Sequence, residues 1–403
     1  MVIPRDPWIV GGIRSALQGS GFWESKTDQL GTNFFFVPSF TDEQTNTIRN
    51  HPLVRDAYVP VGSLTRDYRG HTANVLTDWK GSAESNLFDG NRTISERSVL
   101  SKRAEVVESN VRNSMVLLSW PPGTGLVPQT GDYKFDSSAG EGTYVYSCDY
   151  GANPSHPEFS EILSFAPLFP GPFAVTGFME NDNKRHGSKC IGKAVGKTVG
   201  VARKARVVAT VLDFNTYILE HFLDALALIH EDIYVKGRGA QSVVNLSISI
   251  EANRISAAYQ DRMGKSTRVR RGIESTDHCL AQLIRAIISL GAVFTTGSGN
   301  LPGTPSGYPA LFGNPSDRNY IEDLIVVGSV IDEGVAMWRH SNADWLTCYA
   351  PGDKLRVPDV TVTFDNGYDD SVGGTSYGMS PFFSLFSSFS WLYTLFNVPI
   401  KHR

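Results

Sequence analysis

Short apolar runs alternate with longer segments of helical periodicity in the second half of the chain. The helical segments carry an apolar residue at every third or fourth position. These positions are Ile218, Phe222, Leu226 and Ile229 in the first segment, capped by Asn215 or Thr216, and Leu280, Leu283, Ile284, Ile287 and Ile288 in the second, which Gly291 ends. The short runs predict strands at 143–148, 206–212, 242–250, 292–296 and 324–330. Strands that alternate with helices form a parallel sheet covered on both faces, so the pattern predicts an α/β fold.

A second, smaller pattern precedes this one, at residues 31–62. The run Phe34-Phe35-Phe36-Val37 predicts a strand, and Thr41 and Gln44 are spaced as a capping box that begins a helix. Pro52 ends this helix near Asn50, because the residue before a proline avoids the helical conformation. Residues 54–59 predict another strand. We therefore expect a small α+β unit at 31–62 and leave residues 1–30 unassigned.

Two segments follow neither pattern. Residues 63–109 are polar and show no clear period, which predicts an exposed linker. Residues 381–396 are apolar and rich in Phe and Ser, but they are fewer than the roughly 20 residues of a membrane span, so we expect no membrane anchor. The first twelve residues lack the apolar run of a signal peptide.

Composition narrows the classes of function. The 403 residues carry a net charge of -4, so the chain has no overall basic field and nucleic acid is not an expected partner. Hydrophobic residues make up 41% of the chain, enough for one large core. The four cysteines are spaced too widely for a zinc motif. They could form one disulfide, and the sequence does not identify which two would pair. They are Cys148, Cys190, Cys279 and Cys348.

Four polar residues follow predicted strands or begin helices, where sites form in α/β proteins. Asp149 follows a β-rich run, and His186 begins a helix beside a glycine. Asn300 lies in a Gly/Ser loop after a strand, and Ser376 stands among small residues in the segment Gly373–Pro381. An aspartate, a histidine base and a hydroxyl nucleophile form an acyl-transfer triad, and an asparagine amide can stabilise an oxyanion. Each residue alone is better explained by a turn or a surface position, but together their chain order favours the triad.

On these residues the chain resembles the subtilisin-like serine peptidases, and within them the proteinase K-type branch common in fungi. His156-Pro157-Glu158-Phe159 begins seven residues after Asp149, as it does in that branch. His186-Gly187-Ser188 resembles the histidine motif, with Cys190 at a frequent cysteine position. Val243–Ser247 resembles a substrate-lining strand, and Gly374-Thr375-Ser376 resembles the serine motif. The four motifs follow the family's order over roughly residues 110–381.

The resemblance implies a three-layer α/β/α peptidase domain at 110–380, with a mostly parallel sheet, that cleaves internal peptide bonds of polypeptides. Ser376 would attack the carbonyl, His186 would act as the base, Asp149 would orient the imidazole, and Asn300 would stabilise the oxyanion. Substrate would run beside two segments, with Ser247, Ile248 and Ser249 in one and Gly297, Ser298 and Gly299 in the other. The family uses no cofactor or metal in its chemistry. It often binds structural calcium, for which the sequence offers no clear ligand set.

The resemblance also bears on regulation and location. Residues 31–62 resemble the tail of the family's propeptide, which assists folding and inhibits the enzyme until it is cleaved. We therefore expect the chain's own propeptide to act as an intramolecular inhibitor. We also expect a monomer that is secreted, although the sequence shows no signal peptide.

Several positions depart from the family pattern and keep a second interpretation open. Tyr150 replaces a small hydroxyl residue, Lys189 replaces a second histidine, and Ser249 replaces a glycine. The alternative is a catalytically impaired or inactive remnant that binds peptides without cleaving them. Gly378 stands where alanine is usual, and the small-residue helix expected after it is absent. We interpret the residues from Gly378 onward as a translated intron, with 381–403 as an aberrant hydrophobic C-terminus. The alternative is a genuine divergent terminus.

Overall fold

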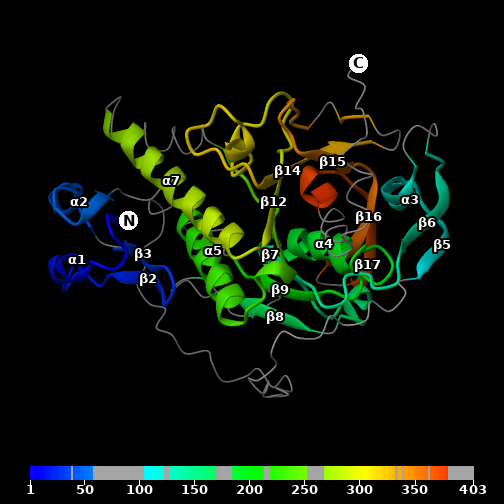
Figure 1. The fold of residues 1–403 in the computed structure, drawn as a ribbon, viewed down its shortest axis with the longest axis horizontal. Helices are drawn as coiled ribbons and strands as arrows, with labels where there is room; N and C mark the ends of the chain where they lie inside the picture. Colours follow the sequence, from blue (N-terminus) through cyan, green and yellow to red (C-terminus); the bar gives the residue numbers. More distant parts are fainter. Residues whose placement is uncertain are drawn as a thin grey trace.

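A seven-stranded sheet with helices on both faces forms the centre of the protein (Figure 1). The computed structural model describes residues 1–37, 40–57, 104–121, 127–162, 164–168, 170, 184–212, 218–251, 267–331, 335–337, 340–361 and 364–379. The strands of the central sheet are β7 (Tyr144–Cys148), β8 (Phe165–Leu168), β9 (Arg206–Thr210), β10 (Ser242–Leu246), β12 (Val293–Gly297), β14 (Leu324–Val330) and β15 (Cys348–Pro351).

All neighbouring strands of this sheet run parallel, in the order β15-β14-β12-β10-β7-β9-β8. The strands that come later in the chain therefore extend from β7 in both directions, which makes β7 the point where the strand order reverses. The sheet and its helices confirm the α/β fold expected from the sequence. In such sheets, ligand sites form at the carboxyl ends of the strands beside the reversal point.

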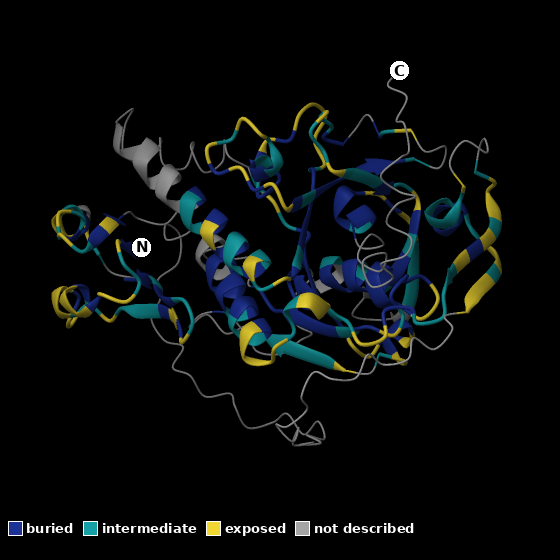
Figure 2. Ribbon diagram, in the orientation of Figure 1, coloured by how far each residue is buried: buried dark blue, intermediate teal, exposed yellow. Residues whose placement is uncertain are grey.

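Alternating side chains of the strands bury the two faces under different helices. Tyr146 and Val244 face α5 (Ile218–Val235) and α7 (Thr267–Ser289), whose apolar positions complete one core cluster. Val145 and Val243, one residue earlier, face α4 (Lys184–Val195) in a second cluster. This alternation is the period of two expected of a strand. Figure 2 shows the buried residues gathered along these contacts.

The N-terminal unit is a four-stranded antiparallel sheet with two short helices on one face. It consists of β1 (Val2–Pro4), α1 (Gly11–Ala16), β2 (Trp23–Thr27), β3 (Gly31–Phe36), α2 (Asp42–Arg49) and β4 (Val54–Ala57). The capping box of Thr41 and Gln44 is confirmed at the start of α2. Phe35 and Val37 pack under the helices, whereas Phe34 and Phe36 pack into the cluster that holds α5 and α7. This sheet therefore lies between its own helices and the central domain, which explains the unbroken apolar run.

The remaining elements lie around the edge of the central domain. Two hairpins are formed by β5 (Glu105–Arg112) with β6 (Thr130–Asp136) and by β16 (Leu355–Thr361) with β17 (Phe364–Val372). A third, small sheet pairs β11 (Ile250–Glu251) with β13 (Gly307–Tyr308). The short helices are α3 (Asn113–Ser119), η1 (Pro157–Phe159), η2 (Gly239–Gln241) and η3 (Ala310–Gly313), and residues 375–379 form a final helical turn.

The structure corrects several sequence-based boundaries. The strand predicted at 242–250 ends at Leu246, and Ile250 belongs to a different sheet. The strand predicted at 206–212 ends at Thr210. The linker predicted at 63–109 overlaps β5, which begins at Glu105; the predicted cap at Asn215 or Thr216 lies outside the described residues. Residues 1–30, left unassigned, supply β1, α1 and β2.

The four cysteines are free, so the disulfide left open by the sequence is not formed in this structure. No helix among the described residues is long and apolar enough to cross a membrane. The segment 381–403 lies outside the described residues. Gly378 and Met379, the first residues of the proposed intron, are described, and Met379 is fully buried beside α4. A Cβ at position 378 would lie 2.9 Å from the carbonyl oxygen of Pro351, so glycine fits this position better than the expected alanine.

Candidate active site

Three neighbouring strands end at one edge of the central sheet, and each is followed by a residue singled out in the sequence. Asp149 comes directly after β7, and Ser247 comes directly after β10. The loop after β12 carries Asn300. Because β10 pairs with both β7 and β12, the sheet brings these three loops side by side.

His186 lies in the first turn of α4 and reaches the loop after β7. Its Nδ1 is 2.9 Å from both carboxylate oxygens of Asp149, which is 1% exposed. Gly187 allows this approach, because a Cβ there would lie 1.9 Å from the carbonyl oxygen of Gly151. The N–H of Tyr150 donates to Asp149 Oδ1 at 2.8 Å and holds the carboxylate in place. A carboxylate at Nδ1 leaves Nε2 as the nitrogen that can act as a base.

Burial and the charge of Asp149 act in opposite directions on the pKa of this histidine, and the net result is a raised pKa. Burial lowers the pKa of His186, but the charge of Asp149 and its hydrogen bond raise that pKa well above the ordinary value of 6.5. Cys190 Sγ lies 3.8 Å from His186 Nδ1, and burial raises the pKa of this thiol, so Cys190 is protonated at neutral pH.

Ser376 lies in the helical turn 375–379 and is 7% exposed. Its Oγ donates to the carbonyl oxygen of Ser247 at 3.0 Å, and Ser247 Oγ donates to the carbonyl oxygen of Ser376 at 3.4 Å. Cys190 Sγ is 3.8 Å from the same Ser376 oxygen. The loop after β10 and the helix α4 therefore both position the serine.

Asn300 is oriented by Thr375, the residue before the serine. Its Oδ1 accepts from the N–H of Thr375 at 2.9 Å and from Thr375 Oγ1 at 3.0 Å. Since the oxygen end of the amide is used in this way, the Nδ2 end is the donor left for a ligand. An oriented amide donor next to a hydroxyl nucleophile is the arrangement that stabilises an oxyanion.

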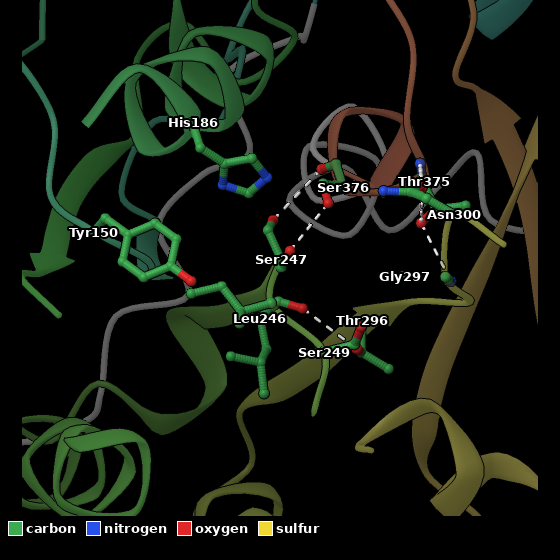
Figure 3. Close-up of a pocket in the computed structure, with 12 residues that line it drawn as sticks. Tyr150, His186, Leu246, Ser247, Ser249, Thr296, Gly297, Asn300, Thr375 and Ser376 are labelled. Atoms are coloured by element: carbon green, nitrogen blue, oxygen red, sulfur yellow. Dashed lines mark hydrogen bonds between the residues drawn. The ribbon is translucent and has the colours of Figure 1, made fainter. Parts of the chain in front are cut away.

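One pocket of about 240 Å³ joins these groups. Figure 3 shows His186 and Tyr150 on one side, Asn300, Thr375 and Gly297 on the other, and Ser247 and Ser376 between them. The lining residues are Tyr150, His186, Leu246, Ser247, Ile248, Ser249, Thr296, Gly297, Gly299, Asn300, Thr375 and Ser376. Asp149 lies beneath this surface. Ser298, expected from the sequence to contact substrate, is not among them, because its buried hydroxyl donates to the carbonyl oxygen of Ser341 at 2.7 Å.

Three contributors were not singled out from the sequence. Thr375 orients Asn300, and the ring of Tyr377 lies 5.4 Å from the imidazole of His186. Asp369 on β17 pairs with Lys189 on α4 at 2.9 Å and so links the helix of His186 to the strand that leads to Ser376. Thr375 and Tyr377 adjoin Ser376 in the sequence, which is a signal that could have found them. No sequence signal identifies Asp369.

Asp149, His186 and Cys190 also form the kind of cluster that can hold a metal ion, with one ligand atom from each within 4.8 Å of the others. The set mixes carboxylate, imidazole and thiol, and calcium prefers oxygen ligands alone. The cluster therefore does not bear on the calcium expected from the resemblance, which stays a prediction. The hydrogen bond between Asp149 and His186 is by itself a sufficient reason for these two side chains to lie together.

Comparison with known proteins finds similarity to fungal proteases. The chain is 30% identical over 259 residues to subtilisin-like protease 3 of Pseudogymnoascus destructans, which covers 62% of this chain and 53% of that protein. It is 32% identical over 196 residues to alkaline protease 1 of Emericella nidulans, covering 46% and 47%. A subtilisin-like protease of Coccidioides posadasii is 37% identical over 129 residues, covering 32% and 29%. The chain thus spans about half or less of the length of these relatives.

Two further comparisons add little. No protein-family model matches the chain. Among solved structures, a cold adapted subtilisin-like serine proteinase aligns over 71% of this chain and 87% of its own, with a TM-score of 0.47 and 16% sequence identity. That structural similarity is too low to carry an argument of its own. The sequence relatives are therefore the comparison that counts.

Proposed function

We propose that this chain, a relative of the subtilisin-like proteases of fungi, hydrolyses internal peptide bonds with Ser376 as its nucleophile. The observation that carries the proposal is the convergence of four groups on one pocket. His186 is bonded to Asp149, Ser376 lines the same pocket, and Asn300 turns its amide donor toward it. The names of the relatives support the same chemistry.

In the proposed reaction, the hydroxyl of Ser376 leaves the carbonyl oxygen of Ser247 and donates to Nε2 of His186. Ser376 Oγ attacks the substrate carbonyl as His186 takes the hydroxyl proton, and the same proton passes to the leaving amine. Asp149 holds the Nδ1–H tautomer and stabilises the imidazolium. Asn300 Nδ2 and the N–H of Ser376 stabilise the oxyanion. Water then cleaves the acyl-enzyme by the reverse sequence of proton transfers.

One observation favours a second candidate, a chain that binds peptides without cleaving them. Ser376 Oγ donates to the carbonyl oxygen of Ser247, a bond that directs its proton away from the base. The hydroxyl can rotate at little cost, so this bond alone does not prevent attack. Binding without cleavage would appear as saturable peptide affinity in a protein that releases no product.

The proposal includes a role for the N-terminal unit as an intramolecular inhibitor. Its sheet packs against α5 and α7, and Ser25 Oγ donates to Asp224 Oδ1 at 2.7 Å with both residues buried. A unit bound this way is available to hold the peptidase inactive until the connecting segment is cut. We further propose a secreted monomer, on the resemblance to the fungal proteases.

Hydrolysis of a denatured protein tests the proposal. Both proteins are tested after the segment between the N-terminal unit and the central domain has been cut and the cutting protease removed. The wild type should then release peptides from denatured casein, and Ser376→Ala should release none above background, since loss of this serine costs subtilisin about 10⁶ in kcat. Asn300→Ala should lower kcat by about 10²–10³, the loss measured for an oxyanion donor in subtilisin. Equal rates for wild type and Ser376→Ala would refute the proposal.

A further inference from the structure

Tyr150 forms the wall of the pocket beside His186, and its ring is the largest side chain that lines it. The two ring centroids are 6.3 Å apart, with the planes inclined by 63°. Figure 3 shows the tyrosine ring extending from the strand end toward Leu246 and Ser247, along the floor of the pocket. Tyr150 is 8% exposed, so most of the residue is buried although it lines the pocket.

The ring cannot swing away easily, because the backbone on both sides is fixed. The N–H of Tyr150 donates to Asp149 Oδ1 at 2.8 Å, and the N–H of Gly151 donates to the carbonyl oxygen of Thr210 at 3.0 Å. Tyr150 also forms an antiparallel bridge with Val211 and belongs to the core cluster that contains Leu212. A side chain anchored in the core is a fixed wall of the pocket.

The pocket is small for a peptide site. Its volume of about 240 Å³ is below the roughly 300–1,000 Å³ of typical ligand pockets. The wall opposite Tyr150, at Gly297 and Asn300, is needed for the oxyanion donor. If the substrate carbonyl lies between Ser376 and Asn300, that side of the pocket is occupied. A substrate side chain next to His186 must then lie against Tyr150.

We propose, on the basis of the peptidase function above, that Tyr150 restricts the substrates to peptides with glycine or alanine at the position against His186. A larger side chain there would overlap the tyrosine ring. The restriction is steric, so it depends on the ring and not on the phenol oxygen. The substrate class is then unfolded polypeptides, which are cut only where glycine or alanine occupies this position.

The test compares three proteins on a peptide library in which each residue flanking the scissile bond is varied in turn. Wild type should cleave substrates with Gly or Ala at one of these positions at least about 10-fold faster, in kcat/KM, than substrates with Leu or Phe there. Tyr150→Ser should raise kcat/KM for the large residues at least 10-fold and remove the preference. Tyr150→Phe keeps the ring and should keep the preference.

The outcomes separate this inference from the proposed function. If wild type cleaves peptides with large and small residues at this position equally well, the restriction is refuted and the peptidase function stays in place. The same follows if Tyr150→Ser keeps the substrate preference of wild type. A wild type whose Ser376 is not labelled by a small fluorophosphonate, with no peptide cleaved, contradicts the function and the inference together. If Tyr150→Ser fails to fold, the wild-type profile and Tyr150→Phe decide: loss of the preference in Tyr150→Phe would contradict a steric wall.

Discussion

At the scale of single residues, His186 and Lys193 lie on the same helix, and their pKa values are shifted in opposite directions. The charge of Asp149 raises the pKa of His186 well above 6.5. Burial lowers the pKa of Lys193 to about 8, and its Nζ donates to the carbonyl oxygen of Val199 at 3.0 Å. The shift of the His186 pKa affects the proposed reaction, and the shift of the Lys193 pKa lowers the stability of the folded protein. Each gives a prediction with a definite sign.

The first prediction concerns the pH dependence of hydrolysis. Only neutral His186 can accept the proton of Ser376, and because its pKa is raised, a higher pH is needed to deprotonate it. We expect kcat/KM to rise with pH and to reach half its maximum clearly above pH 6.5. Asp149→Asn removes the charge that raises the pKa, so its remaining activity should reach half-maximum at lower pH. A wild-type midpoint below 6.5 would contradict the Asp149–His186 pairing.

The second prediction concerns Lys193, which is 1% exposed. A shift from 10.5 to about 8 corresponds to about 3 kcal/mol against the charged form in the folded state. Lys193→Met removes this cost and loses two hydrogen bonds, to the carbonyl oxygen of Val199 and to Met115 Sδ, worth about 1–2 kcal/mol together, so we expect a net gain of about 1–2 kcal/mol at pH 7. Urea unfolding measures the gain, with the exposed Lys197→Met as the control.

The sign of the pH effect provides a check on the Lys193 prediction. The folded pKa lies below the unfolded one, so the cost is complete below about pH 8 and declines between pH 8 and 10.5. The advantage of Lys193→Met should therefore be smaller at pH 10 than at pH 7. A destabilised variant at pH 7, or an advantage that grows with pH, would show that Lys193 is neutral or well solvated.

The four candidate site residues could be singled out from the sequence because each lies in a short local motif. Asp149, His186, Asn300 and Ser376 were found in this way, and the structure brings them to one edge of the sheet. Tyr377 and Asp369 were not found, because their contacts with His186 and Lys189 join positions that the sequence separates by 180 residues or more. Ser298 was expected to contact substrate, since the loop motif does not reveal that its hydroxyl turns toward Ser341.

At the scale of elements, α4 and β17 must keep a fixed distance, because one carries His186 and the other leads to Ser376. Lys189 and Asp369 join them at 2.9 Å, and Gly192 packs directly against Pro358 of β16. The hydrogen bonds from Lys189 and Ser371 offset burial and lower the pKa of Asp369 to about 2. Asp369 is thus ionised at all pH values above the acid range.

The third prediction is a coupling energy between these two residues. Their side chains are 13% and 27% exposed, so a double-mutant cycle with Lys189→Met and Asp369→Asn should give about 1–2 kcal/mol. The exposed pair Lys197–Glu161 is the control and should give less than about 1 kcal/mol. Because the pKa of Asp369 is lowered, the coupling should persist at pH 4 and fade only as the pH falls toward 2. Equal coupling in the two pairs would mean that the contact does not fix α4 to β17.

The elements themselves were predictable where the apolar period was long, as in α5, α7 and β14. The prediction at 242–250 ran too far because Ile248 and Ile250 continue the apolar alternation of β10. The strand ends at Leu246 since the carbonyl oxygen of Ser247 is taken by Ser376, and Ile250 pairs with Tyr308 in another sheet. The three residues of β1 are too few to give a period at all.

At the scale of the whole molecule, the N-terminal unit and the central domain share one core. Met1 and Ile3 join Phe34 and Phe36 in the cluster that includes Phe222 and Leu226 of α5. The apolar run at 34–37 predicted a strand, but not that its two faces pack against different partners. That information lies in the tertiary structure, because the partners of Phe34 and Phe36 are residues of α5 and α7 that lie far away in the sequence.

The fourth prediction tests the attachment of this unit. Asp224→Ala removes the carboxylate that accepts from buried Ser25, a hydrogen bond to a charged group worth about 1.5–3 kcal/mol. Amide exchange in β1 to β4 should become roughly 10- to 100-fold faster. Asp232→Ala is the control on the same helix, since Asp232 accepts from Tyr146 of the central sheet instead. If both variants accelerated exchange equally, the Ser25–Asp224 contact would not be what holds the unit.

The central claim is that Ser376 is a nucleophile activated by His186, and labelling with a fluorophosphonate followed by peptide mapping tests it most directly. The probe is small and reports nucleophilicity without requiring a peptide to fit the pocket. Wild type should carry one label, on Ser376, at a rate that falls at least about 10²-fold in His186→Ala, while heat-unfolded protein should carry none. No label on Ser376 in folded wild type, or an undiminished rate in His186→Ala, would contradict the account.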